Sequence, residues 1–220
     1  MSLKEKILME LQIARHTPDG LNYNILDGEV HIRGFRHSAT FREIPAYIGD
    51  MPVVSLRDLQ ETPLQRKVII PDTVRELYDM CFEFNKEITK FVIPGSVKTF
   101  GEHVFAFCDM LEEIVFDDAI EALSLGMIDN CPALKKIHLP ANLKEIPECF
   151  AGECTGLEEI TIPEGVTKIG AYAFYYCENL KSVRLPESLN YIGGCAFRHC
   201  ALTEKPPIPD GCEVHPEAFD

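Results

Sequence analysis

Prolines recur at one fixed spacing through most of this chain, and that spacing limits the possible folds more than any other feature. Counted from Pro163, six prolines fall in one register of 23 residues, and the single missing position holds Asp117. These prolines are Pro71, Pro94, Pro140, Pro163, Pro186 and Pro209. A repeat of this length predicts a stack of similar units, because one unit alone is too short to bury its own apolar side chains.

Apolar residues occupy fixed positions around each proline. Three residues before the proline position, the chain has Val68, Phe91, Ile114, Ile137, Ile160 and Val183. One residue before it, the chain has Ile70, Ile93, Phe116, Leu139, Ile162, Leu185 and Ile208. This alternation predicts a short strand with its apolar side toward the core, and the proline ends the strand because it lacks a backbone donor. Eleven residues after the proline, Phe82, Phe105, Phe174 and Phe197 recur. The pattern indicates a leucine-rich repeat solenoid with parallel strands and 23-residue repeats.

Three segments resemble a known family closely. They are VIIPDTV, FVIPGSV and TIPEGVTKIGAYAFYYCENLKSV, and they are similar to the BspA-type, or Treponema pallidum-type, leucine-rich repeat. The resemblance covers about residues 21–220, with departures at Asp117 and in LKEIPECFAGEC. It implies a family found largely on bacterial and protozoal surfaces, whose members are associated with adhesion to host proteins or other cells.

The N-terminal part of the chain is expected to cap the solenoid. We expect residues 1–40 to form a helix and hairpin cap, and residues 41–220 to form one continuous solenoid. Ser2 suits a helix N-cap, and Leu3, Ile7, Leu8, Leu11 and Ala14 form an apolar helical stripe. This helix either packs on the first repeat or binds a partner or a membrane surface.

Two further features shape the start of the solenoid. Asp27 and Gly28 lie between short apolar segments and predict a β-hairpin. The spacing after Pro45 is too long for the repeat, which indicates an insertion, and residues 57–67 fit the pattern poorly. We therefore expect an irregular loop over residues 57–67.

Composition excludes several classes of partner. The formal net charge is −14, the wrong sign for binding nucleic acid phosphates or an anionic bilayer. No apolar run approaches the roughly 20 residues of a membrane span. The N-terminus lacks the basic and apolar regions of a signal peptide. As the chain reads, we expect a cytoplasmic protein, or a cell-surface or secreted one if the native gene encodes an upstream signal.

Nine cysteines might suggest a reactive or metal site, but their spacing indicates structure. Five share one repeat position, at which the preceding repeat has asparagine; the row is Asn85, Cys108, Cys131, Cys154, Cys177 and Cys200. We expect this row to be a buried ladder of reduced thiols that satisfies backbone groups. No C-x-x-C pair occurs, so no metal site and no cofactor are expected.

Catalytic motifs are also missing from the sequence. It contains no phosphate-binding loop, no G-x-S-x-G, no H-E-x-x-H and no dinucleotide-binding glycine pattern. The expected function is therefore non-enzymatic, and an enzyme built on the loops is the least favoured alternative.

The outward positions of the strands are the best candidate for a functional surface. Two residues before each proline position, this outward column contains Ile69, Val92, Val115, His138, Thr161 and Arg184. Beside it runs a charged border of Lys67, Lys90, Glu113, Lys136, Glu159 and Ser182. An apolar stripe rimmed by charge is typical of a protein-binding surface, although β-propensity alone or a covering segment would also explain it.

The sequence thus predicts a protein-protein interaction module of unknown partner. It would act as a BspA-like adhesin or binding protein that uses the strand face, or as a cytoplasmic scaffold or regulatory binding protein. Near the end of the chain the repeat decays at Thr203 and Pro206, and Ile208, Val214 and Phe219 are expected to cover the last repeat. If they leave it uncovered, end-to-end self-association through the C-terminal repeat is the alternative.

Overall fold

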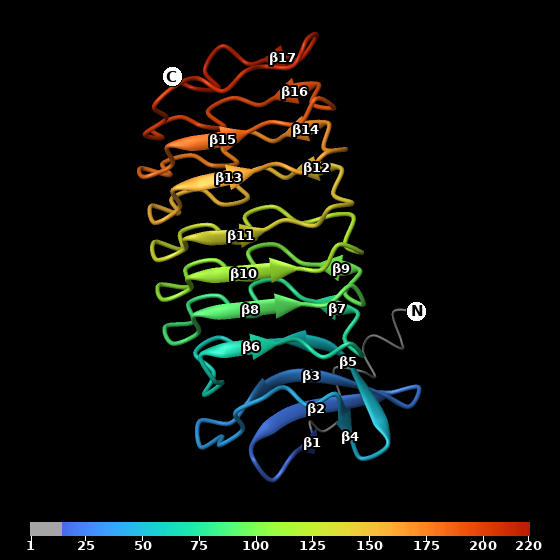
Figure 1. Cartoon of the computed structure of the whole chain (residues 1–220). Helices are drawn as coiled ribbons and strands as arrows, with labels where there is room; N and C mark the ends of the chain where they lie inside the picture. The colour runs from blue at the N-terminus through green and yellow to red at the C-terminus, as the bar shows by residue number, and fades with distance from the viewer. Residues whose placement is uncertain (1–14) are drawn as a thin grey trace.

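The computed structural model describes residues 15–220, which form one stack of coils in chain order (Figure 1). A coil here is one 23-residue repeat. The predicted leucine-rich repeat solenoid with parallel strands is confirmed. Residues 15–220 contain strands and turns but no helix. The helix expected over residues 2–14 lies outside the described residues.

The first parallel ladder lies just before the proline positions and forms what we call the strand face. Its strands are β6 (Lys67–Ile69), β8 (Lys90–Ile93), β10 (Glu113–Phe116), β11 (Lys136–His138), β13 (Glu159–Thr161) and β15 (Ser182–Arg184). Except between β11 and β13, neighbouring strands pair so that identical repeat positions lie side by side, as Phe91 does with Ile114. The core-facing residues at these positions are buried, because alternate residues of a strand point to opposite faces, and only Ile137 among them is half-buried.

A second parallel ladder forms after the proline. Its strands are β5 (Met51–Arg57), β7 (Glu76–Leu77), β9 (Thr99–Phe100), β12 (Glu145–Ile146), β14 (Lys168–Ile169), β16 (Tyr191–Ile192) and β17 (Glu213–Val214). The strands β5, β7 and β9 pair with one another, and β12, β14, β16 and β17 form a separate group. Between the two groups, Leu123 keeps the apolar repeat position and is partly buried.

The cap contributes strands to this second ladder. They are β1 (Arg15–His16), β2 (Leu21–Leu26) and β3 (Glu29–Phe35), and the insertion after Pro45 adds β4 (Tyr47–Ile48). The predicted hairpin between β2 and β3 is confirmed: Asp27 and Gly28 take φ values of 50° and 80°, as a tight hairpin turn requires. Because β3 pairs in parallel with β5, the sheet runs from the cap into the coils. The boundary at residue 40 stays a prediction.

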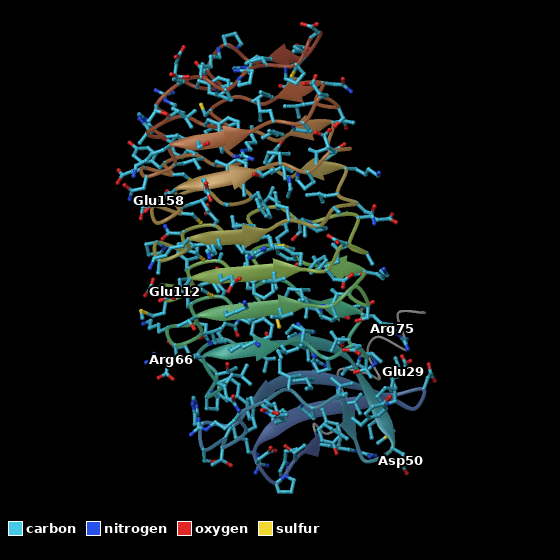
Figure 2. All side chains as sticks on the ribbon, viewed as in Figure 1. Glu29, Asp50, Arg66, Arg75, Glu112 and Glu158 are labelled. Carbon is cyan, nitrogen blue, oxygen red and sulfur yellow. The ribbon has the colours of Figure 1, made fainter. Side chains whose placement is uncertain are left out.

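The irregular segments also have defined shapes. The insertion after Pro45 is an antiparallel pair of β4 with the start of β5, which turns at Gly49. Residues 58–66 contain no strand, as expected for the irregular loop. An ion pair of 2.9 Å between Arg75 and Glu29 joins the second ladder to the cap hairpin, on the edge opposite Arg66, Glu112 and Glu158 (Figure 2).

A third set of coil-to-coil hydrogen bonds was not anticipated from the sequence. In each coil, two residues four positions apart have positive φ, although most of them are not glycine. We call the surface that these turns form the turn face. Its residues include Met80, Phe84, His103, Phe107, Asn130, Cys149, Glu153, Tyr172, Tyr176, Cys195 and His199. Their backbone N–H groups donate to carbonyls of the next coil, as Phe84 does to Ala106 at 3.1 Å. Left-handed backbone costs free energy for ordinary residues. Its recurrence in every coil shows that it belongs to the architecture rather than to one site.

A row of phenylalanines fills the centre of the solenoid. Phe82 stacks on Phe105 with ring centroids 5.7 Å apart, and Phe174 stacks on Phe197 at 5.4 Å. Ile128 and Phe150 take the same buried place in the coils between them. At the C-terminal end Phe219 stacks on Phe197 at 5.3 Å and Ala218 is fully buried, so this segment covers the last repeat, as predicted. Self-association there stays a prediction.

Glycine permits close approach of neighbouring coils at one repeat position. A Cβ atom at Gly170 would lie 2.6 Å from the backbone nitrogen of Glu148 and 2.7 Å from the carbonyl carbon of Pro147. We expect Gly170→Ala to lower the free energy of unfolding by about 2–3 kcal/mol, because backbone atoms of the preceding coil must move. Denaturant unfolding measures this change.

Gly49→Ala is the control for that measurement. No atom lies within 4 Å of a Cβ at Gly49, so only its left-handed backbone, with φ of 61°, opposes alanine. That strain costs about 1 kcal/mol. A Gly170→Ala protein as stable as the Gly49→Ala protein would contradict the close packing of coils.

Candidate functional site

The structure places the outward column on one surface but divides it into two parts. Ile69, Val92, Val115 and His138 lie side by side in register on β6, β8, β10 and β11. Thr161 and Arg184 pair with each other on β13 and β15. In the part of the chain that is described, no backbone pairing joins β11 to β13. The column is therefore interrupted between His138 and Thr161, a feature that the regular spacing did not predict.

Exposure changes along the column. Ile69 is 57% exposed, Val92 and Val115 are half-buried, and the last three residues are exposed. Ile69 also lines a cavity of about 220 Å³ with Ile44, Leu64 and Val68, at the junction of the cap and the first coil. In the apolar half of the strand face, Ile69 therefore projects into solvent beside a recess, whereas Val92 and Val115 are less exposed.

Charged side chains of the border column pair across neighbouring strands. Glu113 accepts hydrogen bonds from Lys90 and from Nε2 of His138, the latter at 2.9 Å. The hydrogen bond from Lys90 is the main cause that lowers the pKa of Glu113 below its ordinary value. The central part of the face is thus held by ion pairs, while Lys136 and Glu159 take part in none among the described residues.

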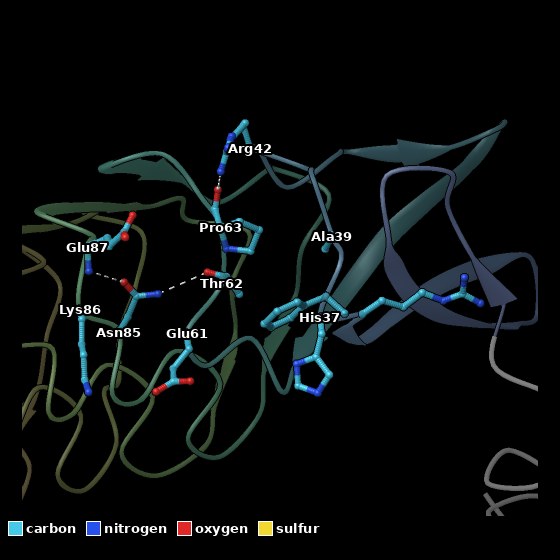
Figure 3. Close-up of a pocket in the computed structure, with 11 residues that line it drawn as sticks. His37, Ala39, Arg42, Glu61, Thr62, Pro63, Asn85, Lys86 and Glu87 are labelled. Atoms are coloured by element: carbon cyan, nitrogen blue, oxygen red, sulfur yellow. Dashed lines mark hydrogen bonds between the residues drawn. The ribbon is translucent and has the colours of Figure 1, made fainter.

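A second cavity, of about 340 Å³, lies between the cap and the first coils (Figure 3). Arg42 donates to the carbonyl oxygen of Pro63 at 2.7 Å, and the amide of Asn85 donates to the hydroxyl of Thr62 at 3.3 Å. The Asn85 carbonyl accepts from the backbone N–H groups of Glu87 and Ile88. These polar groups of the wall hold the turn together, while the charged side chains of Glu61, Lys86 and Glu87 also line the cavity.

The five cysteines of the predicted ladder form one row behind the turns. Each thiol lies within 3.1–3.3 Å of a backbone carbonyl oxygen 26 residues earlier, and the pairs are Cys108 with Phe82, Cys131 with Phe105, Cys154 with Ile128, Cys177 with Ala151 and Cys200 with Phe174. Desolvation raises the pKa of the Cys131 thiol well above its ordinary value. All nine cysteines are free. The row therefore connects coils by hydrogen bonds from thiols to carbonyls.

Titratable groups gather on the turn face of the middle coils. The imidazole of His103 packs against Gly126, and the carboxylate of Asp129 packs against Gly152. A Cβ atom added to either glycine would collide with the side chain that lies over it. Burial, and then the charge of Glu153, raise the pKa of Asp129 to about 6. Among residues 15–220, however, no group of three His, Cys, Asp or Glu side chains is placed to hold a metal ion.

Exposed aromatic rings form another cluster that sequence reasoning missed. Tyr172, Tyr175, Tyr176 and His199 contact one another edge to face or tilted, with Tyr176 and His199 centroids 4.2 Å apart. Three of the four lie at left-handed positions of the turn face, and Tyr175 lies next to one. The rings are packed against each other and enclose no cavity, so we regard them as turn packing.

The comparisons with known proteins agree with this geometry. The family model of the BspA type leucine rich repeat region matches residues 60–152 and 147–220. The chain therefore belongs to the BspA-type leucine-rich repeat family. A search of curated proteins finds no match.

Solved structures of bacterial leucine-rich repeat proteins share the fold. One from Eubacterium ventriosum ATCC 27560 has a TM-score of 0.70 at 21% identity, over 93% of this chain and 50% of that one. One from Bacteroides ovatus ATCC 8483 has a TM-score of 0.60 at 25% identity, over 89% of this chain and 59% of that one. The T. pallidum leucine-rich repeat protein has a TM-score of 0.62 at 23% identity, over 89% of this chain and 84% of that one.

This chain thus spans about half the length of the E. ventriosum protein. Its fold and family are those of a protein-interaction repeat module. None of the structural elements between residues 15 and 220 is a helix that could cross a membrane.

Thiol labelling tests the cysteine row. In the native protein we expect the buried thiols to react with iodoacetamide at least about a hundredfold more slowly than after denaturation, because local opening must come first. These thiols are Cys81, Cys108, Cys131, Cys154, Cys177 and Cys195, whereas Cys149, Cys200 and Cys212 are half-buried and should react first. Mass spectrometry of digested samples gives each rate. Early labelling of Cys131 or Cys154 would contradict the row.

The raised pKa of Asp129 predicts a dependence of stability on pH. Its folded-state pKa of about 6 lies above the ordinary value, so the folded state binds more protons between about pH 4 and 6 and becomes less stable as pH rises through that range. Asp129→Asn should therefore gain about 1 kcal/mol over the wild type near pH 7.5, a figure reduced for partial solvent exposure, and nothing near pH 4.

Denaturant titrations at the two pH values provide the measurement. Asp109→Asn changes an exposed aspartate and should stay within about 0.5 kcal/mol of the wild type at both. An equal gain for Asp129→Asn at both pH values would point to packing rather than to ionisation.

Proposed function

We propose that this protein is a non-enzymatic protein-binding module whose strand face is the binding surface. The observation that carries the proposal is the row of apolar side chains Ile69, Val92 and Val115, which lie side by side across three paired strands. The most exposed of them, Ile69, stands beside an apolar recess. Exposed apolar rows with a charged rim are typical of protein interfaces.

Membership of the BspA-type family supports a particular kind of binding role. Because BspA-type repeats resemble those of adhesion proteins on bacterial surfaces, we propose an adhesin or similar binding protein whose partner is a protein. A cytoplasmic scaffold or regulatory binding protein is the second candidate, supported by the nine free thiols. A partner recovered from host extracellular proteins favours the first, and one recovered only from the producing cell favours the second.

The test replaces the most exposed residue of the row. Ile69→Arg should change the free energy of unfolding by less than about 0.5 kcal/mol, because the side chain already meets solvent. It should weaken partner binding by about 1–2 kcal/mol or more, as charge in the centre of an apolar contact does. Affinity capture followed by mass spectrometry identifies the partner, and titration of the purified pair gives the loss. Val92 and Val115 are half-buried, so Ile69 separates binding from stability more cleanly.

The control lies one residue away. Val68 is 4% exposed and points into the core, so Val68→Asp should unfold the first coil by placing a charge there. If Ile69→Arg destabilises the protein as much as Val68→Asp, the side chains of the outward column do not point to solvent. If Ile69→Arg folds and still captures every partner of the wild type, the apolar row is not the binding surface.

A further inference from the structure

The strand face opens at its one interruption, between β11 and β13. These strands belong to consecutive coils (Figure 1), yet no backbone hydrogen bond joins residues 135–139 to residues 158–162. The same coils stay joined on the turn face, where the N–H groups of Gly126, Ile128 and Asn130 donate to the carbonyls of Glu148, Phe150 and Gly152 at 2.8–3.2 Å. The coils are therefore held together on one side and separated on the other.

The opening gives access to side chains that other coils bury. Ile137 is half-buried, whereas Ile114 and Ile160, at the same repeat position, are 0% and 4% exposed. A cavity of about 420 Å³ reaches Ile137 and Thr161 from the surface. It adjoins one of about 610 Å³ that shares both residues and continues along the face. The recess thus has an apolar floor.

The walls of the opening are strand edges. Parallel strands pair through backbone N–H and C=O groups, and β11 and β13 present such groups to the opening without a partner strand there. A strand inserted between the two edges would need about 9.6 Å between them, and Cα atoms of β11 and β13 still approach within 8 Å of each other, so no strand fits there. An extended peptide segment can therefore reach the opening only from its outward side.

The charge around the opening is opposite to that of the protein as a whole. Lys135, Lys136 and Arg184 line it, and none of them is in an ion pair among the described residues. Glu159 is the only carboxylate in that lining, and Asp117 and Asp118 line the adjoining cavity at its far end from Lys135 and Arg184, which do not line it. In a chain of net charge −14, this is a local basic site on an acidic protein. It favours carboxylate side chains and disfavours basic ones.

We propose that the opening between β11 and β13 binds an extended, acidic peptide segment of a partner protein. The segment lies across the outward side of the opening, with its aliphatic atoms on Ile137 and its carboxylates against Lys136 and Arg184. This inference rests on the proposed function, because it uses the same face, and it adds recognition by the polar half of the face to recognition by Ile69.

The experiment measures binding of a fluorescein-labelled octapeptide of alternating glutamate and valine to the full chain. Fluorescence anisotropy is recorded near 150 mM salt, where the Debye length of about 8 Å limits repulsion from distant carboxylates. We expect Lys136→Glu and Arg184→Glu each to weaken binding roughly tenfold. Lys67→Glu should change it less than about twofold, since Lys67 occupies the same repeat position on β6 but lies outside the opening.

Matched peptides and variants separate the outcomes. Peptides with lysine or glutamine in place of glutamate should bind the wild type at least about tenfold more weakly. Ile69→Arg should leave binding of the glutamate peptide unchanged while it weakens binding of the natural partner. Loss of peptide binding in Ile69→Arg but not in Lys136→Glu would overturn this inference and leave the proposed function standing. No binding of the glutamate peptide to the wild type, or equal binding of the lysine peptide, would also overturn it.

Hydrogen exchange gives a second, independent readout. With the glutamate peptide bound, amide exchange should slow in the fragments that contain residues 136–138 or 159–161, and stay unchanged in those that contain β8. Binding without protection at either strand would contradict binding at the opening.

Discussion

The hydrogen bonds between neighbouring coils are the interaction on which this structure depends. One coil has too few residues to enclose Phe105 or Ile114, and each becomes buried only when the coils on both sides are present. Two strand ladders and the turn face supply these bonds, and the thiol of Cys131 adds another to the preceding coil. Because each ladder satisfies its backbone within the stack, the fold does not depend on the outward side chains, which can serve recognition.

The ladders also decide where recognition can take place. Where all of them are intact, as between β8 and β10, the strand face is closed and offers only the outward side chains to a partner. Where the strand ladder fails but the turn face holds, as between β11 and β13, backbone edges and the side chain of Ile137 become accessible. The face therefore combines an apolar row near Ile69 with a basic opening near Lys136, two surfaces of different chemistry on one rigid support.

Much of this could be predicted from residue spacing, because stacking in register turns each repeat position into a row in space. The alternation around Ile114 placed Val115 outside, and the Asp27-Gly28 pair predicted the hairpin of the cap. The turn face was missed since its left-handed residues, such as Phe84 and Tyr176, have no common chemistry by which to recognise them. Asp117 and the departure in LKEIPECFAGEC did indicate irregular coils, but not that the strand ladder would break.

The sequence by itself determined the solenoid, its core rows and its outward column, because periods of two and of 23 residues act through local backbone geometry and repeated neighbours. Only the tertiary structure decided how far adjacent coils approach, which sets the exposure of Ile137, the cavity beside Ile69 and the pKa of Asp129. Each of these depends on the summed packing of two or more coils. A difference of a few ångströms there leaves the repeat pattern unchanged while it opens or closes a surface.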